Sequence, residues 1–466
     1  MDAEISRLTH DKIAAGKSGL LLIADNYDAF DVRLLATRNA TSSLDLMYYL
    51  WHDDQTGRAL MQEVVRAAER GVRVRMLLDD LNPRSSDVAY LALDSHPSIE
   101  VKLFNPSGMR NGSVFRLLEL VSRAFAMTRR MHNKAWIADD SVAIVGGRNI
   151  GNAYFDAAET NFRDLDLLLL GPAVQQTRRI FSAFWNCDAA TPIQLLNASE
   201  QGERTGYLDR LAGKLEPSPS GSFGSWRSMA EFVAASNGIC WTNSVRVISD
   251  PPEKVCGERR GNWLTEELLP IIRSTSESLE IVSPYFIPGR NGFEILTGLA
   301  KRGAQVAVVT NSLAATDVAV VHGAYSKYRW KLIQNGIQLF ELQPFDRQPS
   351  ISVFGSKGAS LHTKAFTVDD RVGFVGSFNF DPRSISLNCE MGVLFSDRTL
   401  VEDLRRRFAE EKSLQTSYRL SLSDGSMQWL GIVDGEMRHY SNEPEASIYR
   451  RGIATVVGCL PIESQL

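Results

Sequence analysis

The sequence predicts an α/β protein built from two related halves. Strand-like and helical stretches alternate in both parts of the 466-residue chain, a pattern typical of sheets covered by helices. The same order of stretches occurs in residues 42–106 and again in residues 277–344. Further along each half, one segment matches its counterpart without a gap. These observations indicate that one structural unit is present twice.

The first half begins with the strand-like stretch SSLDLMYYLW over residues 42–51. A helical periodicity follows over residues 56–71 and ends at Gly71, a residue type that commonly closes helices. VRVRMLLDD over residues 72–80 predicts the next strand, and after a further helix IEVKLFNP over residues 99–106 predicts another. We therefore expect strands and helices to alternate through this half.

The second half repeats this order with modest sequence identity. We expect a strand within ESLEIVSPYFI at residues 277–287 and a helix within GFEILTGLAKRG at residues 292–303. AQVAVVTNS at residues 304–312 and GIQLFELQP at residues 336–344 predict two more strands. The shared pattern supports a duplicated fold.

The strongest repeat contains a histidine and a lysine two residues apart. MHNKAWIADDSVAIVGGRN at residues 131–149 matches LHTKAFTVDDRVGFVGSFN at residues 361–379 position for position. In each copy the asparagine follows the histidine by 17 positions. The repeat therefore predicts a duplicated site. Its paired positions are His132 and His362, Lys134 and Lys364, Asp139 and Asp369, Gly146 and Gly376, and Asn149 and Asn379.

A change in composition separates the two halves. The segment EPSPSGSFGSW is rich in proline, serine and glycine and predicts a linker, with one helical piece around MAEFVAAS. The tail, with MQWL and CLPIESQL, matches neither repeat. We expect a boundary near residue 240 and four parts: a first half over 1–200, a linker over 201–243, a second half over 244–420 and a tail over 421–466.

Composition argues against several classes of protein. The net charge of −4 and the pI near 6.1 provide no overall basic field, so nonspecific binding of nucleic acid is not implied. The five cysteines form no CxxC pair, which argues against a disulfide framework and a zinc site and favours a reducing, cytosolic compartment. The sequence lacks an apolar run of roughly 18 residues and a signal-peptide pattern. We expect any membrane contact to be peripheral.

Strand geometry indicates which side chains of the repeat act together. Residues i and i+2 of a strand share a face, so His132 and Lys134 project together, as do His362 and Lys364. The aspartate follows the histidine by seven positions, an odd number, and lies in a turn-like ADDS or VDDR segment. We therefore expect Asp139, and Asp369 in the second copy, to brace a hairpin.

Another carboxylate is needed to orient each histidine, and the next strand offers candidates. NCEMGVLF contains Glu390, which follows His362 by 28 positions, and FRDLDLLLL contains Asp164 and Asp166. Alignment of NCE with DLD makes Asp166 the counterpart of Glu390. A carboxylate on Nδ1 fixes the tautomer and raises the basicity of an imidazole. We predict that Asp166 and Glu390 orient the histidines.

Two histidines, two lysines and two asparagines suit phosphoryl transfer. Lysine and asparagine can hold the nonbridging oxygens of a phosphodiester and stabilise charge in the transition state. One histidine can attack phosphorus while the other protonates the leaving oxygen. A single H-x-K on a strand is usually a solvated face, but two gapless copies favour catalysis. A metal site needs three or four convergent ligands, so we expect neither a metal nor a cofactor.

The pattern H-x-K-x4-D followed by G-G/S-x-N, present twice, resembles the signature of the phospholipase D superfamily. The chain is similar in detail to the bacterial cardiolipin synthases, particularly those of the C type. The segments that carry this resemblance are LDLMYYLWHDDQTG, GVRVRMLLDD, HPSIEVKLFNP, RRMHNKAWIADDSVAIVGGRNIG, FRDLDLLLLGP and LPIESQL.

The resemblance implies two phospholipase D-like α/β halves related by a pseudo-twofold axis, each with a mixed central sheet flanked by helices. One active site would lie where the two motifs meet. A phosphohistidine would form without metal, with His132 as nucleophile and His362 as general acid; the pseudosymmetry makes these two roles exchangeable on sequence grounds. The resemblance counts Asp139 and Asp369 among the catalytic residues. The phosphate-binding residues would be Lys134, Asn149, Lys364, Ser377 and Asn379.

The implied reaction is the transfer of a phosphatidyl group from phosphatidylglycerol or phosphatidylethanolamine to another phosphatidylglycerol. Water in place of the lipid alcohol would give phospholipase D hydrolysis. A nuclease is a further alternative, disfavoured by the acidic pI and by the lack of an aromatic-interleaved basic run. A noncatalytic scaffold is disfavoured because both motifs are complete. Some family members act beside a small accessory protein, which this sequence does not reveal.

An enzyme acting on such lipids is expected in the cytoplasm, peripherally associated with the bacterial inner membrane. Two segments are candidates for docking. Residues 112–132 combine apolar and basic side chains in a helical pattern, and residues 222–236 form a second candidate. An ordinary core helix with a solvated basic side is the alternative for residues 112–132.

Overall fold

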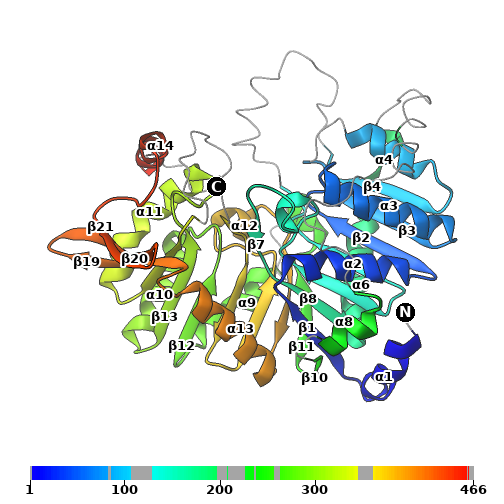
Figure 1. Ribbon diagram of the computed structural model, residues 1–466, viewed down its shortest axis with the longest axis horizontal. Helices are drawn as coiled ribbons and strands as arrows, with labels where there is room; N and C mark the ends of the chain where they lie inside the picture. The colour runs from blue at the N-terminus through cyan, green and yellow to red at the C-terminus, as the bar shows by residue number, and fades with distance from the viewer. Residues whose placement is uncertain are drawn as a thin grey trace, which may run out of the picture.

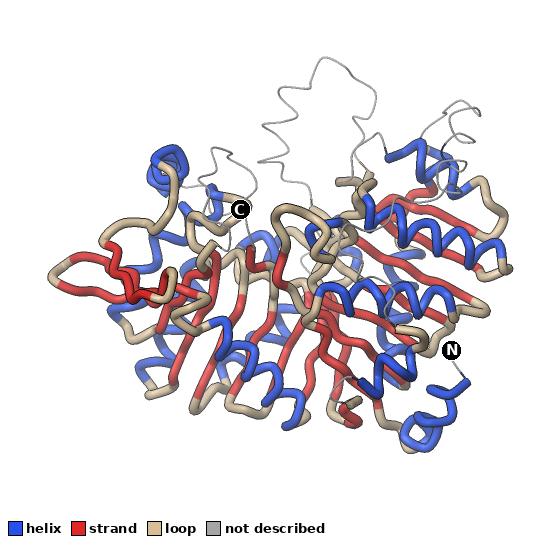
Figure 2. Tube along the Cα trace, in the orientation of Figure 1, coloured by secondary structure: helices blue, strands red, loops and turns tan. Residues whose placement is uncertain are grey.

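The computed structural model describes residues 3–81, 86–106, 129–196, 207, 226–235, 238–256, 263–344, 360–458 and 460. It forms two α/β units that lie side by side, the first drawn in blue to cyan and the second in green to orange (Figure 1). Strands form the interior of each unit and helices lie outside them (Figure 2). The predicted fold class of two α/β halves is confirmed.

The first sheet has nine strands, and its centre is mixed. β2, β3 and β4 run parallel, while the strands on either side of them pair antiparallel. The order across the sheet is β10 (Cys240–Thr242), β1 (Ser18–Ile23), β8 (Asp166–Leu170), β6 (Val142–Gly146), β5 (Ala135–Ala138), β2 (Ser43–Tyr48), β3 (Arg73–Asp79), β4 (Ile99–Phe104) and β9 (Ala190–Pro192).

The second sheet repeats this arrangement and has ten strands. β12, β13 and β14 run parallel and correspond to β2, β3 and β4. The order is β11 (Val245–Ser249), β18 (Met391–Phe395), β17 (Val372–Gly376), β16 (Ala365–Val368), β12 (Ser278–Val282), β13 (Gln305–Asn311), β14 (Gln338–Leu342), β19 (Ser417–Ser423), β20 (Ser426–Val433) and β21 (Glu436–Tyr440). The strands predicted in both halves are therefore confirmed.

Helices cover both sheets. The first half contains α1 (Ala3–Ala14), α2 (Asn26–Arg38), α3 (Gln55–Glu69), α4 (Ser86–Asp94), η2 (Asn152–Tyr154), α6 (Pro172–Trp185), η3 (Ile193–Leu195) and α8 (Met229–Ala235). The second half contains η4 (Pro252–Cys256), α9 (Leu264–Arg273), α10 (Gly289–Lys301), α11 (Ala319–Gln334), α12 (Pro382–Ser386), α13 (Arg398–Glu411) and α14 (Ile448–Gly458). No helix among the described residues is long and apolar enough to cross a membrane.

The central strands of each sheet are buried on both faces, since successive residues point to opposite sides and both sides are covered. In β2, Leu44 and Leu46 join one apolar cluster with α2 and α3, whereas Met47 joins a second cluster with α6. This second cluster also contains Val309 of β13 and side chains of α13. One apolar core therefore continues from the first half into the second and fixes their relative position.

The chain passes from the first sheet to the second between β10 and β11. β19 runs through the expected boundary at residue 420, and β20 and β21 extend the second sheet at its edge. The division of the chain into domains stays a prediction. Most of the expected linker, residues 201–206 and 208–225, lies outside the described residues.

The two predicted docking segments have different outcomes. Residues 112–128 lie outside the described residues. In the second segment, Met229 and Phe232 of α8 are buried in the core of the first half, so these apolar side chains do not face a membrane. The prediction that this segment docks on a membrane is therefore wrong for α8, because its one apolar face packs against α2.

Candidate active site

Each histidine of the repeat is held in place by backbone from the other half. The N–H of His132 donates to the carbonyl of Cys389 at 2.8 Å, and the N–H of His362 donates to the carbonyl of Arg163 at 2.9 Å. The short strands β7 (Phe162–Arg163) and β15 (Ser360–Leu361) pair in parallel just before the second histidine. The site is therefore assembled from both halves at once.

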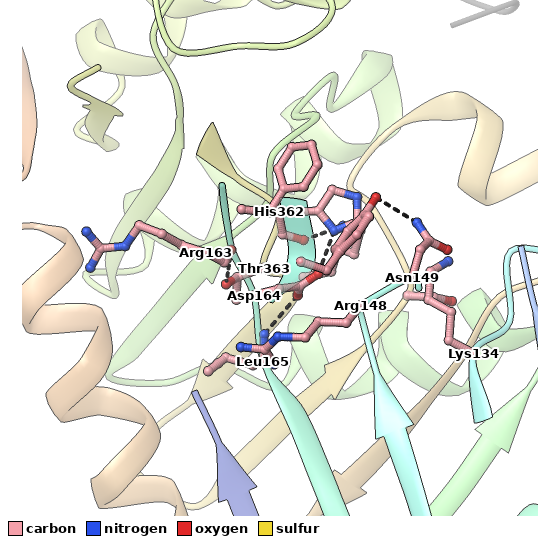
Figure 3. Close-up of polar contacts among 12 residues, drawn as sticks. Lys134, Arg148, Asn149, Arg163, Asp164, Leu165, His362 and Thr363 are labelled. Carbon is pink, nitrogen blue, oxygen red and sulfur yellow. Dashed lines mark hydrogen bonds and ion pairs between the residues drawn. The ribbon is translucent and has the colours of Figure 1, made fainter. Parts of the chain in front are cut away.

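The carboxylates on the histidines are also exchanged between the halves. Nδ1 of His132 lies 2.8 Å from Oε2 of Glu390, and Nδ1 of His362 lies 2.5 Å from Oδ2 of Asp164. Figure 3 shows Asp164 reaching the His362 ring. Because Nδ1 of each ring is engaged, Nε2 is the nitrogen left for chemistry. Glu390 is thus an orienting residue as predicted, but for the histidine of the other half.

The prediction that Asp166 orients a histidine is wrong, and Asp164 has this position. Asp166 is fully buried and its Oδ2 lies 2.9 Å from Arg33 and 3.3 Å from Arg148. Strand register explains the error. Gly146 pairs with Asp166, whereas its counterpart Gly376 pairs with Gly392, so the position equivalent to Glu390 is Asp164. Alignment of the apolar runs LDLLL and MGVLF would have found this residue.

The two lysines are buried beside the histidines. Nζ of Lys134 donates to the carbonyl of His132 at 2.6 Å, and Lys364 donates to the carbonyl of His362. Burial lowers the pKa of Lys134 to about 7 and that of Lys364 to about 8. The cation of Lys364 also lowers the pKa of Lys134, and both lysine cations lower the pKa of His362. A bound phosphodiester anion would relieve this clustering of positive charge.

Burial also lowers the pKa of both imidazoles. The pKa of His132 falls to about 4, with the Glu390 carboxylate opposing the shift and Lys134 adding to it. The pKa of His362 lies well below its ordinary value because of burial and the cations of Lys364 and Lys134. Without substrate, both rings are therefore neutral near pH 7. A neutral imidazole is the form that can attack phosphorus.

The other predicted phosphate-binding residues, Asn149, Asn379 and Ser377, differ in the partners of their side chains. Nδ2 of Asn149 donates to the hydroxyl of Tyr154 at 2.8 Å, while Oδ1 of buried Asn379 has no hydrogen-bond partner among the described residues. The hydroxyl of Ser377 donates to Glu390 and accepts from the N–H of Met391 at 3.0 Å, and its binding of phosphate stays a prediction. Ser377 therefore supports the carboxylate on His132, and its own carbonyl lies 3.1 Å from Nδ1 of that imidazole.

Asp139 and Asp369 occupy hairpin turns. Both have positive φ, as does the residue after each, and the N–H two positions after each aspartate donates to the carbonyl before it, which is the geometry of a type I′ turn. Asp139 accepts hydrogen bonds from the N–H groups of Thr41, Ser42 and Ser43, at the start of β2. Asp369 accepts them in the same way from residues 276–278, at the start of β12. The backbone N–H groups lower the pKa of both carboxyls, against the effect of burial.

These contacts confirm the hairpin interpretation. Tyr49 directly follows β2 and packs against His132, so Asp139 and His132 lie at opposite ends of that strand. The aspartates of the motif therefore fix the sheet and do not contact the imidazoles.

Aromatic side chains lie beside both histidines, and the sequence did not predict them. The ring of Tyr49 meets that of His132 edge-on at 4.8 Å between centroids, and Nζ of Lys134 lies 5.3 Å from the same tyrosine ring. Tyr154 and Phe162 lie 5.3 and 5.0 Å from His362. These rings limit the access of water and strengthen the electrostatic interactions at the site.

Two further residues at strand ends hold the residue before each histidine. Oδ2 of Asp79, at the end of β3, accepts from the N–H of Met131 at 2.8 Å. Asn311, at the end of β13, bonds both the N–H and the carbonyl of Leu361 at 2.9 Å. They occupy corresponding places in the two sheets, and only knowledge of the strand pairing could have revealed them.

One group of metal-ligand types occurs among the described residues, away from the histidine pair. His322, Glu341 and Glu443 offer atoms within 4.8 Å of one another. Arg329 pairs with Glu341 at 3.0 Å and also with Glu443. An arginine already neutralises both carboxylates, so the group is an ion-pair network of the second half and not part of the site.

Comparisons with known proteins agree with this geometry. The family model described as cardiolipin synthase, PLD-like domain, matches residues 35–185 and 268–412, more than half of the chain. Cardiolipin synthase C of Escherichia coli (strain K12) is 37% identical, with 96% of each chain covered. Cardiolipin synthase of Staphylococcus aureus (strain N315) is 24% identical over 89% of this chain and 72% of its own length.

A solved structure confirms the arrangement of the two halves. The phosphatidylserine synthase of Haemophilus influenzae Rd KW20 superimposes with a TM-score of 0.62, covering 97% of this chain and 96% of its own, at 14% identity. This likeness concerns the fold. The extent of the family match and the identity to the Escherichia coli relative identify the chain as a member of the cardiolipin synthase family with phospholipase D-like domains.

Proposed function

We propose that the protein is a phosphatidyltransferase that makes cardiolipin from phosphatidylglycerol, with phosphatidylglycerol or phosphatidylethanolamine as donor. The observation that carries this function is the crossed pair of histidines. Each Nδ1 is bound to a carboxylate of the other half, and two buried lysines lie beside the rings. Relatives that share most of the chain bear the name cardiolipin synthase, which supports a lipid substrate over a nucleic acid.

In the first step Nε2 of His132 attacks the phosphorus of the donor lipid. The bond from phosphorus to the headgroup oxygen breaks, and His362 gives this oxygen a proton, so that glycerol or ethanolamine leaves. Lys134, Lys364, Asn149 and Asn379 would hold the nonbridging oxygens. The phosphodiester anion also raises the pKa of His362, which favours the imidazolium form that a general acid needs.

In the second step a hydroxyl of phosphatidylglycerol resolves the phosphohistidine. His362 takes the proton of this hydroxyl, the new bond from oxygen to phosphorus forms, and the bond from phosphorus to Nε2 of His132 breaks. The two steps balance, and His132 and His362 return to their starting forms. Water in place of the lipid hydroxyl gives phosphatidic acid, so exclusion of water by the aromatic rings favours transfer.

The protein meets its substrates in a bilayer. We propose that it associates peripherally with the cytoplasmic face of the bacterial inner membrane. The phospholipid substrates suggested by its relatives support this location.

A direct assay tests the function. Purified protein is incubated in EDTA with phosphatidylglycerol vesicles, with and without phosphatidylethanolamine, and the lipids are separated and identified by mass spectrometry. We expect cardiolipin with wild type and none with His132→Ala or His362→Ala. Phosphatidic acid as the sole product would make the protein a hydrolase, and the absence of any product from wild type would contradict the proposal.

A further inference from the structure

The last described helix, α14, carries a face of exposed apolar side chains. Seven large hydrophobic residues are exposed among the described residues, and four of them lie in or directly after this helix. Ile448 is 88% exposed, Tyr449 53%, Val456 62% and Leu460 42%. Tyr449 and Val456 are seven positions apart and share one side of the helix with Gly452, whose missing side chain would meet only open space.

The opposite face of α14 is firmly packed, so the exposed residues are held on a rigid element. Ala454 and Val457 lie against Gly323 of α11, where an added Cβ would come within 2.7 Å of the Ala454 carbonyl. Ala446 and Ala454 join Leu313 and Ala319 in a small apolar cluster. The exposed face is therefore not the loose end of a helix.

The packed face connects α14 to the active site through the loop that follows β13. Arg450 is 1% exposed and donates from NH2 to the carbonyl of Thr316. The next residue, Asp317, accepts a hydrogen bond of 2.8 Å from the hydroxyl of Tyr285. Burial raises the pKa of Asp317, and the cation of Lys364 is near enough to oppose this shift. α14 thus packs against the loop of Thr316 and Asp317, which is close enough to Lys364 for the charges of Asp317 and Lys364 to interact.

α11 makes a second connection. His322 of α11 lies 3.2 Å through Nδ1 from the carbonyl of Asn311, and the Asn311 amide holds Leu361, which directly precedes His362. Figure 1 shows α14 at the upper left of the second half, with α12 and β7 also in its upper part but nearer the first half. Ser384 of α12 bonds Glu390, the carboxylate on His132. A surface that contacts α14 therefore lies on the same side as the site.

The charge of this segment points to the chemistry of the surface. Residues 446–460 contain no acidic residue and two arginines, of which Arg450 lies buried on the packed face and Arg451 is partly exposed, in a chain whose net charge is −4. Lys327 of α11 adds a further cation, because its Nζ donates to the carbonyl of Leu460 at 2.7 Å. Apolar side chains bordered by cations suit the interface of a bilayer that contains anionic phospholipid.

We infer that α14 and Leu460 form the docking surface through which the protein binds the surface of an anionic membrane. Tyr449 and Val456 enter the headgroup region, while Arg451 and Lys327 face lipid phosphates. Docking there brings the loop of Thr316 and Asp317 next to the bilayer, so that a lipid headgroup reaches the histidines while its acyl chains stay in the membrane. This inference rests on the proposed function, which requires lipid substrates.

Vesicle binding tests the inference with the full chain. Wild type and the double variant Tyr449→Asp, Val456→Asp are sedimented with vesicles of phosphatidylglycerol and phosphatidylcholine, and with phosphatidylcholine alone. Wild type is expected to bind only the anionic vesicles, and the double variant to bind them at least about tenfold more weakly. Met437→Asp, which changes a 62% exposed residue of β21, is the matched control and should bind like wild type.

Activity on dispersed lipid separates docking from catalysis. The double variant should convert short-chain phosphatidylglycerol below its micellar concentration at the rate of wild type, and lose activity only on vesicles. Vesicle binding by the double variant equal to that of wild type would overturn the inference. So would a wild-type dimer in light scattering that the double variant dissociates, because a second copy would then cover α14. Failure of wild type to make cardiolipin from either lipid would instead contradict the proposed function.

Discussion

Nδ1 of His132 lies 2.8 Å from Oε2 of Glu390, a residue 258 positions later in the chain and in the other half. His362 has the converse relationship with Asp164, 198 positions earlier. Each imidazole therefore depends on a carboxylate of the opposite half for its tautomer and orientation. Each pair of imidazole and carboxylate therefore needs residues of both halves of the chain.

Substitution of the orienting carboxylates should reduce catalysis while the fold is kept. We expect Glu390→Gln and Asp164→Asn to lower kcat by about 10²- to 10⁴-fold, because the amide cannot stabilise an imidazolium and favours the wrong tautomer. The measurement is the initial rate of cardiolipin formation, with circular dichroism as the check on folding. A loss below about threefold in both variants would contradict the crossed arrangement.

Asp166 should behave differently from Asp164, two residues away. Asp166→Asn removes a carboxylate that pairs with the buried guanidinium groups of Arg33 and Arg148. Because the arginines remain buried without their partner, we expect the free energy of unfolding to fall by about 3–5 kcal/mol. Urea unfolding of Asp166→Asn and Asp164→Asn makes the comparison. Equal stability of the two variants would argue against this assignment.

Lys134 should show the cost of keeping a cation in the site. Its pKa in the folded protein is about 7, below the ordinary 10.5, so the unfolded chain binds more protons between these values. The penalty is fully present below pH 7 and shrinks as the pH rises towards 10.5. We expect Lys134→Met to be inactive and more stable than wild type by at least about 1 kcal/mol at pH 6. Denaturant unfolding at pH 6 and pH 9 should show a smaller gain at pH 9.

Asp139 should contribute to stability and little to chemistry. Asp139→Asn weakens the hydrogen bonds from the N–H groups before β2, and we expect a loss of about 1–2 kcal/mol at pH 7. The pKa of Asp139 is lowered in the folded protein, so the advantage of wild type should fade as the pH drops below about 4. Cardiolipin formation per folded molecule should change less than threefold. A loss of activity as large as that of His132→Ala would restore a catalytic role.

The strands, helices and repeat were predictable because they depend on local patterns. Alternating apolar residues mark β2 and β3, and the gapless match between residues 131–149 and 361–379 identifies the histidines and lysines. The hairpin role of Asp139 followed from strand parity alone.

The partners of the histidines were not predictable from these local patterns. Which carboxylate reaches His132 depends on how the two halves pack, and a register error of two residues put Asp166 in place of Asp164. Tyr49 and Asn311 reach the site from the ends of other strands, so only the sheet order places them there.

The central claim is that His132 forms the covalent intermediate while His362 transfers the proton. The most direct test mixes His362→Ala with a phosphatidyl ester whose activated headgroup leaves without a general acid. The reaction is quenched rapidly, and the peptides are analysed by mass spectrometry. The account predicts a phosphatidyl adduct on His132, because the acceptor then lacks its base. An adduct on His362 in the matched variant His132→Ala, with none on His132 in His362→Ala, would contradict it.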